Sequence, residues 1–182
     1  MKLTLFFFFA ALIVSTSTAQ TWKVIKSGSS VEFKIKNAGI TVNGSFSGFE
    51  AVIIFNPNDL LHSSIQGTIQ TNTISTGIKL RDNHLKGEDY FNASNYSHMY
   101  FTSKRIISKG NGSYVVTGDL KIKGKTHELS IPVTYLEGLN SGTFKTNFIL
   151  NRRDLGVGGS SWTLSDQVII SLSLMVEKQT KN

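Results

Sequence analysis

Apolar and polar residues alternate along most of the chain, with the period of two that is typical of β-strands. Val31, Phe33 and Ile35, for example, are separated by the charged residues Glu32 and Lys34. Other alternating stretches begin at Ile40, Ile65, Met99, Tyr114, Leu129, Phe144 and Val168. Together with residues 22–25 and the short apolar run at 51–55, they predict eight or nine strands.

Glycine and asparagine mark tight turns between several of these stretches. Gly110-Asn111-Gly112 and Lys123-Gly124-Lys125 predict hairpins, because glycine and asparagine tolerate the positive φ of such turns. Pro132 cannot donate a ladder hydrogen bond, so it predicts an edge, a bulge or a barrel corner within its strand. Short connections favour an antiparallel meander, and closing it into an all-β barrel of about eight strands removes the exposed sheet edges.

The interior of such a barrel is either filled by side chains or holds a ligand. One face of the predicted strands combines aromatic residues with small ones, and this combination favours an elongated apolar cavity. A solid core remains the alternative interpretation of the same pattern. The residues on this face are Phe33, Phe46, Phe101, Phe144 and Phe148, together with Gly44, Gly67, Gly118 and Thr146.

Residues 71–96 depart from the strand pattern. Ile78, Leu80 and Leu85 predict part of one helical face, and Gly87 is a typical helix stop. The following residues, 88–96, predict an irregular return to the sheet. A connection of this length in a compact domain usually has a function. We therefore expect a short helical lid across one end of the barrel, with its aromatic side chains facing inward.

The first nineteen residues predict a secretory signal peptide. Lys2 precedes an unbroken apolar run at 3–14, and small residues precede a cleavage point between Ala19 and Gln20. The remaining residues, 20–182, then form one domain in the periplasm or outside the cell. The chain has no cysteine, so its stability depends on core packing and sheet hydrogen bonds.

The charge is modest and well distributed. The chain carries a net charge of +7, and its lysines at 34, 36, 121 and 123 alternate with apolar residues, which predicts a solvated sheet face. Such a charge allows a weak, transient contact with anionic lipid headgroups. Nucleic acid binding is not expected, because no aromatic and basic platform accompanies the charge.

The sequence offers little for catalysis. It lacks a cysteine nucleophile and a Gly-x-Ser-x-Gly motif. Asp82 and His84 would point about 200° apart on a helix, so they cannot form a base and its orienting partner there. His62, His98 and His127 lack the spacing of zinc ligands. We expect no catalytic residue, no metal site and no cofactor, and we interpret His84 as a capping or packing residue.

Arg152 has the same strand parity as Phe148 and Leu150, which predicts an inward-facing guanidinium group at the end of a strand. A buried arginine needs an acidic or hydrogen-bonding partner. One interpretation is an ion pair that ties the lid to the barrel, and the other is a contact with a polar ligand head. The candidate acidic partners are Asp82, Glu88, Asp89 and Asp154.

Four stretches in order resemble the motifs of one family. Residues 81–85 and 89–91 resemble the signature Arg-Asp-x-His-Leu…Asp-Phe-Phe of the YceI-like proteins. Residues 43–46 are similar to its Gly-x-Phe turn, and residues 118–133 to its Gly-Asp-Leu-Thr-Ile-Lys-Gly…Leu-Pro-Val block. Residues 151–157 resemble Asn-Arg-x-Asp-Phe-Gly-Ile. Tyr90, Lys121 and Leu155 depart from the pattern.

The resemblance implies a lipocalin-like, extended antiparallel barrel whose cavity binds a polyisoprenoid or a similar long-chain lipid, without catalytic residues. We expect a periplasmic or secreted protein that carries or sequesters such a lipid. The alternatives are a stress-response interaction protein with a solid barrel and an enzyme that uses the His84 region. The oligomeric state stays open, with a homodimer among the options. The candidate ligand-binding residues are Phe33, Phe46, Ile65, Ile69, Leu80, Leu85, Phe91, Tyr96, Phe101, Phe144, Phe148, Leu150 and Arg152.

Overall fold

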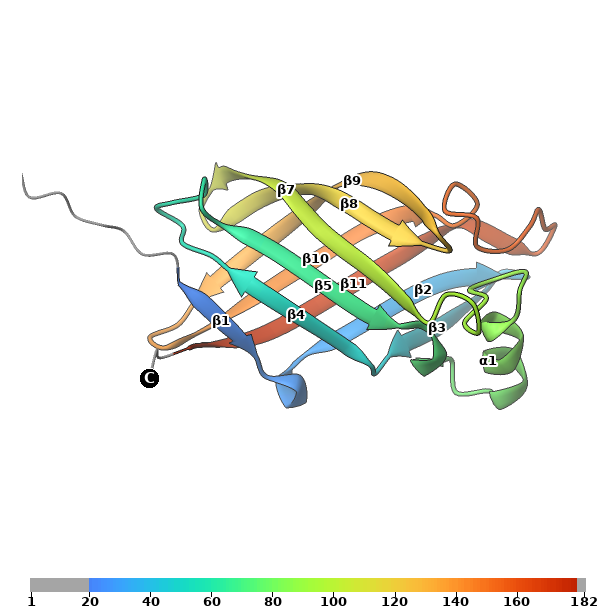
Figure 1. Cartoon of the computed structure of the whole chain (residues 1–182). Helices are drawn as coiled ribbons and strands as arrows, with labels where there is room; N and C mark the ends of the chain where they lie inside the picture. The colour runs from blue at the N-terminus through green and yellow to red at the C-terminus, as the bar shows by residue number, and fades with distance from the viewer. Residues whose placement is uncertain (1–19, 180–182) are drawn as a thin grey trace, which may run out of the picture.

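Long antiparallel strands wrap around a common axis in the computed structural model, which describes residues 20–179 (Figure 1). The predicted signal peptide, residues 1–19, lies outside the described residues. The strands are β1 (Thr21–Val24), β2 (Ser30–Asn37), β3 (Ile40–Phe46), β4 (Phe49–Ile54), β5 (Ser64–Gln70), β6 (Ile74–Ser75), β7 (His98–Gly110), β8 (Ser113–Ile122), β9 (Lys125–Glu137), β10 (Ser141–Asn151) and β11 (Leu164–Lys178). The helical elements are η1 (Lys26–Gly28), η2 (Thr71–Thr73) and α1 (Lys79–Lys86).

The sheet closes on itself because β1 pairs with both β4 and β11. Around the ring the order is β1-β4-β5-β7-β8-β9-β10-β11, which makes a closed barrel of eight strands among the described residues. The remaining strands β2, β3 and β6 extend the wall beside β11 at the end that carries α1 (Figure 1). The all-β, lipocalin-like barrel with one helix that the sequence predicted is thereby confirmed.

Both predicted glycine turns form. Asn111 and Gly112 connect β7 to β8 with φ values of 51° and 72°, and Lys123 and Gly124 connect β8 to β9 with 48° and 75°. Positive φ at both central positions is what a two-residue turn needs to match the twist of its strands. The turns set the register of the β7–β8–β9 meander, which forms one side of the barrel.

Pro132 lies at a strand edge, as its chemistry predicted. It pairs with Val115 of β8, but β9 joins β10 only from Thr134 to Glu137. Residues 125–133 of β9 therefore present one side outside the β9–β10 ladder. An edge tolerates proline because that side of the strand makes no ladder hydrogen bonds.

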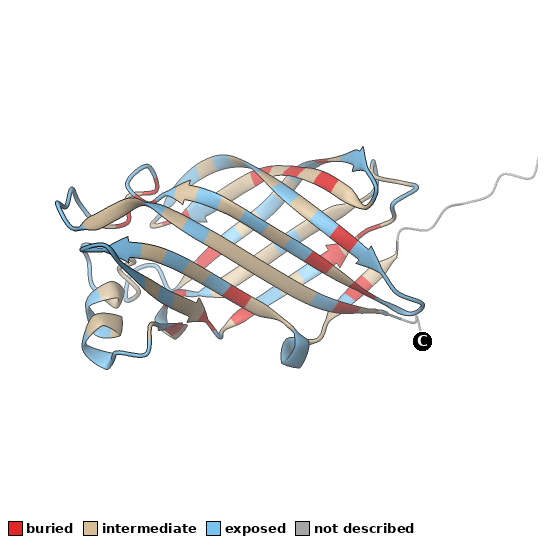
Figure 2. Ribbon diagram, turned by 180° about the vertical axis from the view of Figure 1, so that it is seen from behind, coloured by how far each residue is buried: buried red, intermediate tan, exposed pale blue. Residues whose placement is uncertain are grey.

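Two groups of buried side chains occupy the two ends of the barrel, and Figure 2 shows their positions along the strands. The group at the end with β1 and the C-terminus contains an aromatic cluster that we call the plug: Trp22, Phe55, Tyr114, Tyr135 and Phe144. The group at the other end lies beneath α1 and includes Val31, Phe46, Phe49, Ile74, Met99, Ile122, Leu155 and Val157.

The segment between β6 and β7, residues 76–97, is the lid segment. Its helix α1 ends at Gly87 as predicted, but the predicted apolar face is wrong. Ile78 precedes the helix in an extended conformation, and Leu80 lies about 140° around the helix axis from Leu85. Leu80 is 82% exposed, whereas Leu85 packs against the buried group beneath it.

Candidate functional site

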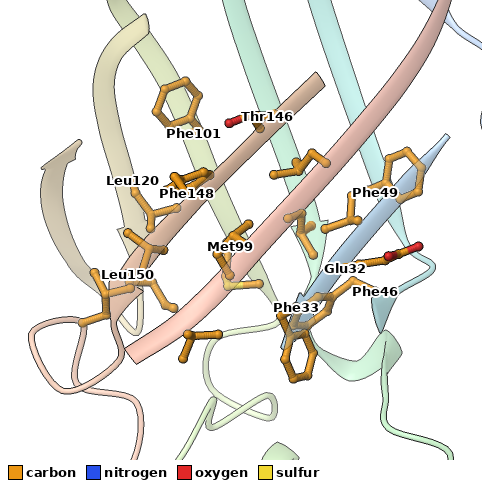
Figure 3. Close-up of a pocket in the computed structure, with 18 of the residues that line it drawn as sticks. Glu32, Phe33, Phe46, Phe49, Met99, Phe101, Leu120, Thr146, Phe148 and Leu150 are labelled. Carbon is orange, nitrogen blue, oxygen red and sulfur yellow. The ribbon is translucent and has the colours of Figure 1, made fainter. Parts of the chain in front are cut away.

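An apolar cavity of about 320 Å³ lies inside the barrel between the plug and the lid segment. Every strand from β2 to β11 contributes to its wall. Figure 3 shows side chains from several strands directed into this common space, among them Phe101, Leu120 and Phe148. At the lid end the wall includes Leu85 and Phe91, so the cavity reaches the lid segment.

The plug closes the cavity at its far end through contacts between aromatic rings. The ring of Phe55 lies 5.0 Å from Tyr135, 5.2 Å from Tyr114 and 5.2 Å from Phe144, centroid to centroid. Its contacts with all three are edge-to-face, a favourable arrangement for aromatic pairs. The indole of Trp22 donates a hydrogen bond of 3.0 Å to the carbonyl oxygen of Phe55, which completes the seal.

Burial in this cluster changes the acidity of its tyrosines. Loss of water around the hydroxyl raises the pKa of Tyr135 to about 12, with smaller effects from Glu137 and Tyr114. The pKa of Tyr114 is also raised, again chiefly by burial. Among residues 20–179 the Tyr135 hydroxyl has no hydrogen-bond partner. The plug therefore favours neutral tyrosines.

The glycines on the inner face have two different roles. The ring of Phe33 lies over Gly44 and that of Phe101 over Gly118, so a Cβ atom at either glycine would collide with a ring. Gly67 faces open space, because a Cβ atom there would have its nearest neighbour at 4.0 Å. The predicted glycine gap is thus real at Gly67, whereas Gly44 and Gly118 accommodate phenylalanine rings.

Thr146 places a buried, unpartnered polar atom on the predominantly apolar wall. The Oγ1 atom of Thr146 is buried and has no hydrogen-bond partner among residues 20–179. Figure 3 shows this atom directed toward Phe101.

The structure places eleven of the thirteen predicted ligand-binding residues on the cavity wall: Phe33, Phe46, Ile65, Ile69, Leu85, Phe91, Phe101, Phe144, Phe148, Leu150 and Arg152. Leu80 and Tyr96 do not line the cavity, and their prediction as wall residues is wrong. Leu80 points to solvent from the outer side of α1. Tyr96 lies over Gly124 in the β8–β9 turn and is 37% exposed.

An aromatic series connects the lid segment to the wall. Phe91 contacts Phe46 edge-to-face at 5.6 Å between centroids, and Phe46 lies 5.9 Å from Phe33. The backbone N–H of Phe91 donates to the carbonyl of Leu85, and both side chains line the cavity. The lid segment thus faces the cavity with apolar groups.

Arg152 is buried as predicted, but the predicted acidic partners are wrong. Its guanidinium group donates to the carbonyl oxygens of Val157, Gly159, Leu164 and Ser165 and to the carboxylate of Asp166. These five acceptors match the five N–H groups of arginine. Arg152 therefore organises its own loop, residues 152–163. The chain folds back around the guanidinium group, and the acceptors of this loop and of residues 164–166 use its donors in place of the lid acids.

The lid segment is joined to this loop by main-chain contacts that the sequence did not indicate. The N–H of Gly158 donates to the carbonyl of Asp89 at 2.9 Å. The Lys123 ammonium donates to the carbonyls of Glu88 and Gly156 at 3.1 and 2.8 Å, so this lysine is not part of a solvated sheet face. The predicted turn at Lys123-Gly124-Lys125 was the detectable sign, since it places this lysine in a turn and not on a strand.

Comparison with known proteins agrees with this geometry. The model of the YceI-like domain matches residues 22–176. The chain belongs to the YceI-like family. A UPF0312 protein of Staphylococcus epidermidis, SERP2314, is 35% identical over 138 residues, which cover 71% of this chain and 77% of that protein.

Solved structures show the same fold. Burkholderia cenocepacia BcnA is 30% identical and superposes with a TM-score of 0.80 over 84% of this chain and 99% of its own. A polyisoprenoid binding domain from Saccharophagus degradans is 14% identical, with a TM-score of 0.71 over 88% of this chain and 99% of its own. At 14% identity, this similarity shows only that the two proteins share a fold.

The signature residues of the family have structural roles in this chain. Arg81 donates to the hydroxyl and the carbonyl of Thr76, and Asp82 accepts from the N–H and the hydroxyl of the same residue. The His84 ring packs against Tyr90 at 5.0 Å, which is the packing role that we expected. Asp82 and His84 thus fix the internal conformation of the lid segment through separate contacts.

No helix within residues 20–179 is long and apolar enough to cross a membrane. The same residues contain no group of three or more histidine, aspartate or glutamate side chains that is suited to a metal ion.

We predict that Arg152→Lys destabilises the protein by about 2–4 kcal/mol, because one ammonium cannot replace five N–H donors to four carbonyls and a carboxylate. Urea denaturation measures the change. Arg153→Lys is the matched control, since Arg153 is half-exposed and makes a single contact with Asp166 at 3.4 Å. It should change stability by no more than about 0.5 kcal/mol. Equal effects of the two substitutions would contradict the assigned role of Arg152.

We also predict a specific alkaline response of the plug. The folded state holds the Tyr135 proton up to a pKa of about 12, while the unfolded chain releases it near the ordinary value of 10.0. The contribution of protonated Tyr135 to the free energy of unfolding is therefore fully present below about pH 10, and it is lost as the pH rises toward about 12. Urea midpoints measured across this range should fall less for Tyr135→Phe than for the wild type. Identical pH profiles would contradict the prediction.

Proposed function

We propose that this protein binds one long apolar lipid of the polyisoprenoid type inside the barrel, as a periplasmic or secreted carrier or sequestering protein. The observation that supports it best is the cavity itself, which has apolar walls from ten strands and a blind end at the plug. A solid barrel would leave no such space. The hydrocarbon end would lie toward the plug, with the polar head at the lid end.

The chemistry of the wall favours a long hydrocarbon chain over a polar ligand. Each buried CH₂ group contributes about 0.8 kcal/mol of transfer free energy without needing a hydrogen-bond partner. Among the cavity-lining residues that the structure describes, Thr146 alone has a buried polar atom without a hydrogen-bond partner. Methyl-branched isoprenoid units suit an irregular wall of phenylalanine, leucine and isoleucine side chains.

Three further observations support the proposal. The Saccharophagus degradans domain, which has the same fold, is a polyisoprenoid binding domain. The apolar run at residues 3–14 has the pattern of a signal peptide, which supports export. The contacts of Asp82 and His84 are structural, which favours binding over catalysis at this end of the barrel.

Lipid extraction and mass spectrometry of natively purified protein test the proposal directly. We expect a long-chain isoprenoid at a stoichiometry near one per protein. Protein that is repeatedly recovered empty, and that fails to take up a purified long-chain polyprenol, would contradict the proposal.

Filling the open space at Gly67 should block binding without disturbing the wall. We predict that Gly67→Leu reduces polyprenol uptake by about tenfold or more, because its side chain would enter the cavity where a Cβ atom meets nothing within 4.0 Å. Gln66→Leu is the matched control, since it adds the same side chain to the exposed face of the same strand. Uptake is measured by co-purification, and circular dichroism checks the fold. Equal uptake by both variants would contradict a ligand in this cavity.

A further inference from the structure

Three exposed segments surround the lid end of the barrel. They are the β2–β3 hairpin at residues 36–41, the start of the lid segment at 77–80, and part of the β10–β11 loop at 159–163, and every residue in them is exposed. We call these segments the rim. Figures 1 and 2 both place α1, the β2–β3 hairpin and the β10–β11 loop at this end. The N–H of Ala38 donates to the carbonyl of Thr163 at 2.8 Å, which joins two of the segments directly.

The rim is also the mouth of the cavity. Residues beside each segment line the cavity wall: Asn37 and Val42 at the hairpin, Thr76 before the helix, and Leu164 after the loop. Apolar groups that project from the rim therefore surround the entrance through which a ligand would pass.

Large apolar side chains project from all three segments. Trp162 is fully exposed, Leu80 is 82% exposed and Ile40 is 71% exposed, while Ile78 is 53% exposed. A cluster of exposed apolar groups at one end of a protein usually marks a binding surface. Tryptophan in particular favours the boundary between water and lipid, because its ring is both apolar and able to donate a hydrogen bond.

The charge of the rim has a single sign. Lys36 and Lys79 lie within the three segments, which contain no aspartate or glutamate. The opposite end also has exposed leucines, Leu61 and Leu139, but the charges beside them are mixed: Asp59 and Glu137 precede them by two residues, and the Lys178 ammonium donates to the Leu139 carbonyl. Apolar projections combined with lysines fit an anionic lipid surface.

We propose that the rim docks the protein on a lipid bilayer that carries anionic headgroups, with Trp162, Leu80 and Ile40 at headgroup level. Separate apolar side chains around an opening suit insertion into a fluid surface, whereas a protein partner generally needs a continuous, complementary patch of about 800 Å². In this orientation the mouth of the cavity faces the membrane. The transfer of lipid through it rests on the proposed function, but the docking itself does not.

Vesicle sedimentation tests the docking. The probes are vesicles of phosphatidylcholine alone and vesicles with about 30% phosphatidylglycerol, the latter carrying the anionic charge that should strengthen binding. We predict that the double variant Trp162→Ser with Leu80→Ser partitions at least about tenfold less onto the anionic vesicles than the wild type. The double variant Leu61→Ser with Leu139→Ser, at the opposite end, should bind like the wild type.

Brominated lipids give a second measurement, because the protein has two tryptophans at opposite ends. Quenching should affect Trp162 and leave Trp22, which is buried in the plug, unchanged. Equal vesicle binding by both double variants, or quenching of Trp22 alone, would overturn the proposal. A dimer in sedimentation velocity that disappears in the Trp162→Ser, Leu80→Ser variant would also overturn it and assign the rim to a second copy of the chain.

A third measurement separates docking from lipid binding. Polyprenol delivered from a dilute ethanol stock reaches the cavity without a membrane, so the rim variant should take it up normally while failing to extract it from vesicles. A wild type that docks on vesicles and binds no polyprenol would overturn the proposed function and leave the docking intact. A wild type that binds polyprenol but does not dock would overturn the docking alone.

Discussion

The pairing of β1 with both β4 and β11 is the interaction on which the rest of the structure depends. Because this pairing closes the sheet, the alternate side chains of each strand point into one shared interior, and the ring has no open end of unpaired strands. An interior enclosed by eight strands is wide enough to leave space between opposite walls. Phenylalanine and leucine at the inward positions make that space apolar.

The two ends of this interior are constructed differently. At one end five aromatic rings in mutual contact form the plug and need no further cover. At the other end the barrel depends on added segments, each held by polar contacts to main-chain atoms. Arg152 organises the β10–β11 loop, while Arg81 and Asp82 join helix α1 to Thr76 within the lid segment. A permanently packed end and an end closed by surface segments are what a binding protein with one entrance requires.

Much of the fold could be predicted because it depends on local rules. Strand alternation requires only a period of two, and the turns at Asn111-Gly112 and Lys123-Gly124 require only residues that tolerate positive φ. The alternation of inward and outward positions along each strand then predicted most of the cavity wall, including Phe101 and Phe148. The predictions were wrong where the outcome depends on how a loop or a helix packs, even over short separations in the sequence. The exposure of Leu80 depends on how the helix is held to β6, and the acceptors of Arg152 depend on how its loop curls.

The sequence by itself therefore determined the strands, the turns, the apolar lining and the family signature, since each follows from residue type and spacing. Only the tertiary structure decided that the aromatic residues seal one end and that surface segments cover the other. It also decided that Gly44 accommodates a ring whereas Gly67 leaves a gap, and that the exposed apolar residues gather at the mouth. The physical reason is that ring closure brings these residues together from strands that are far apart along the chain.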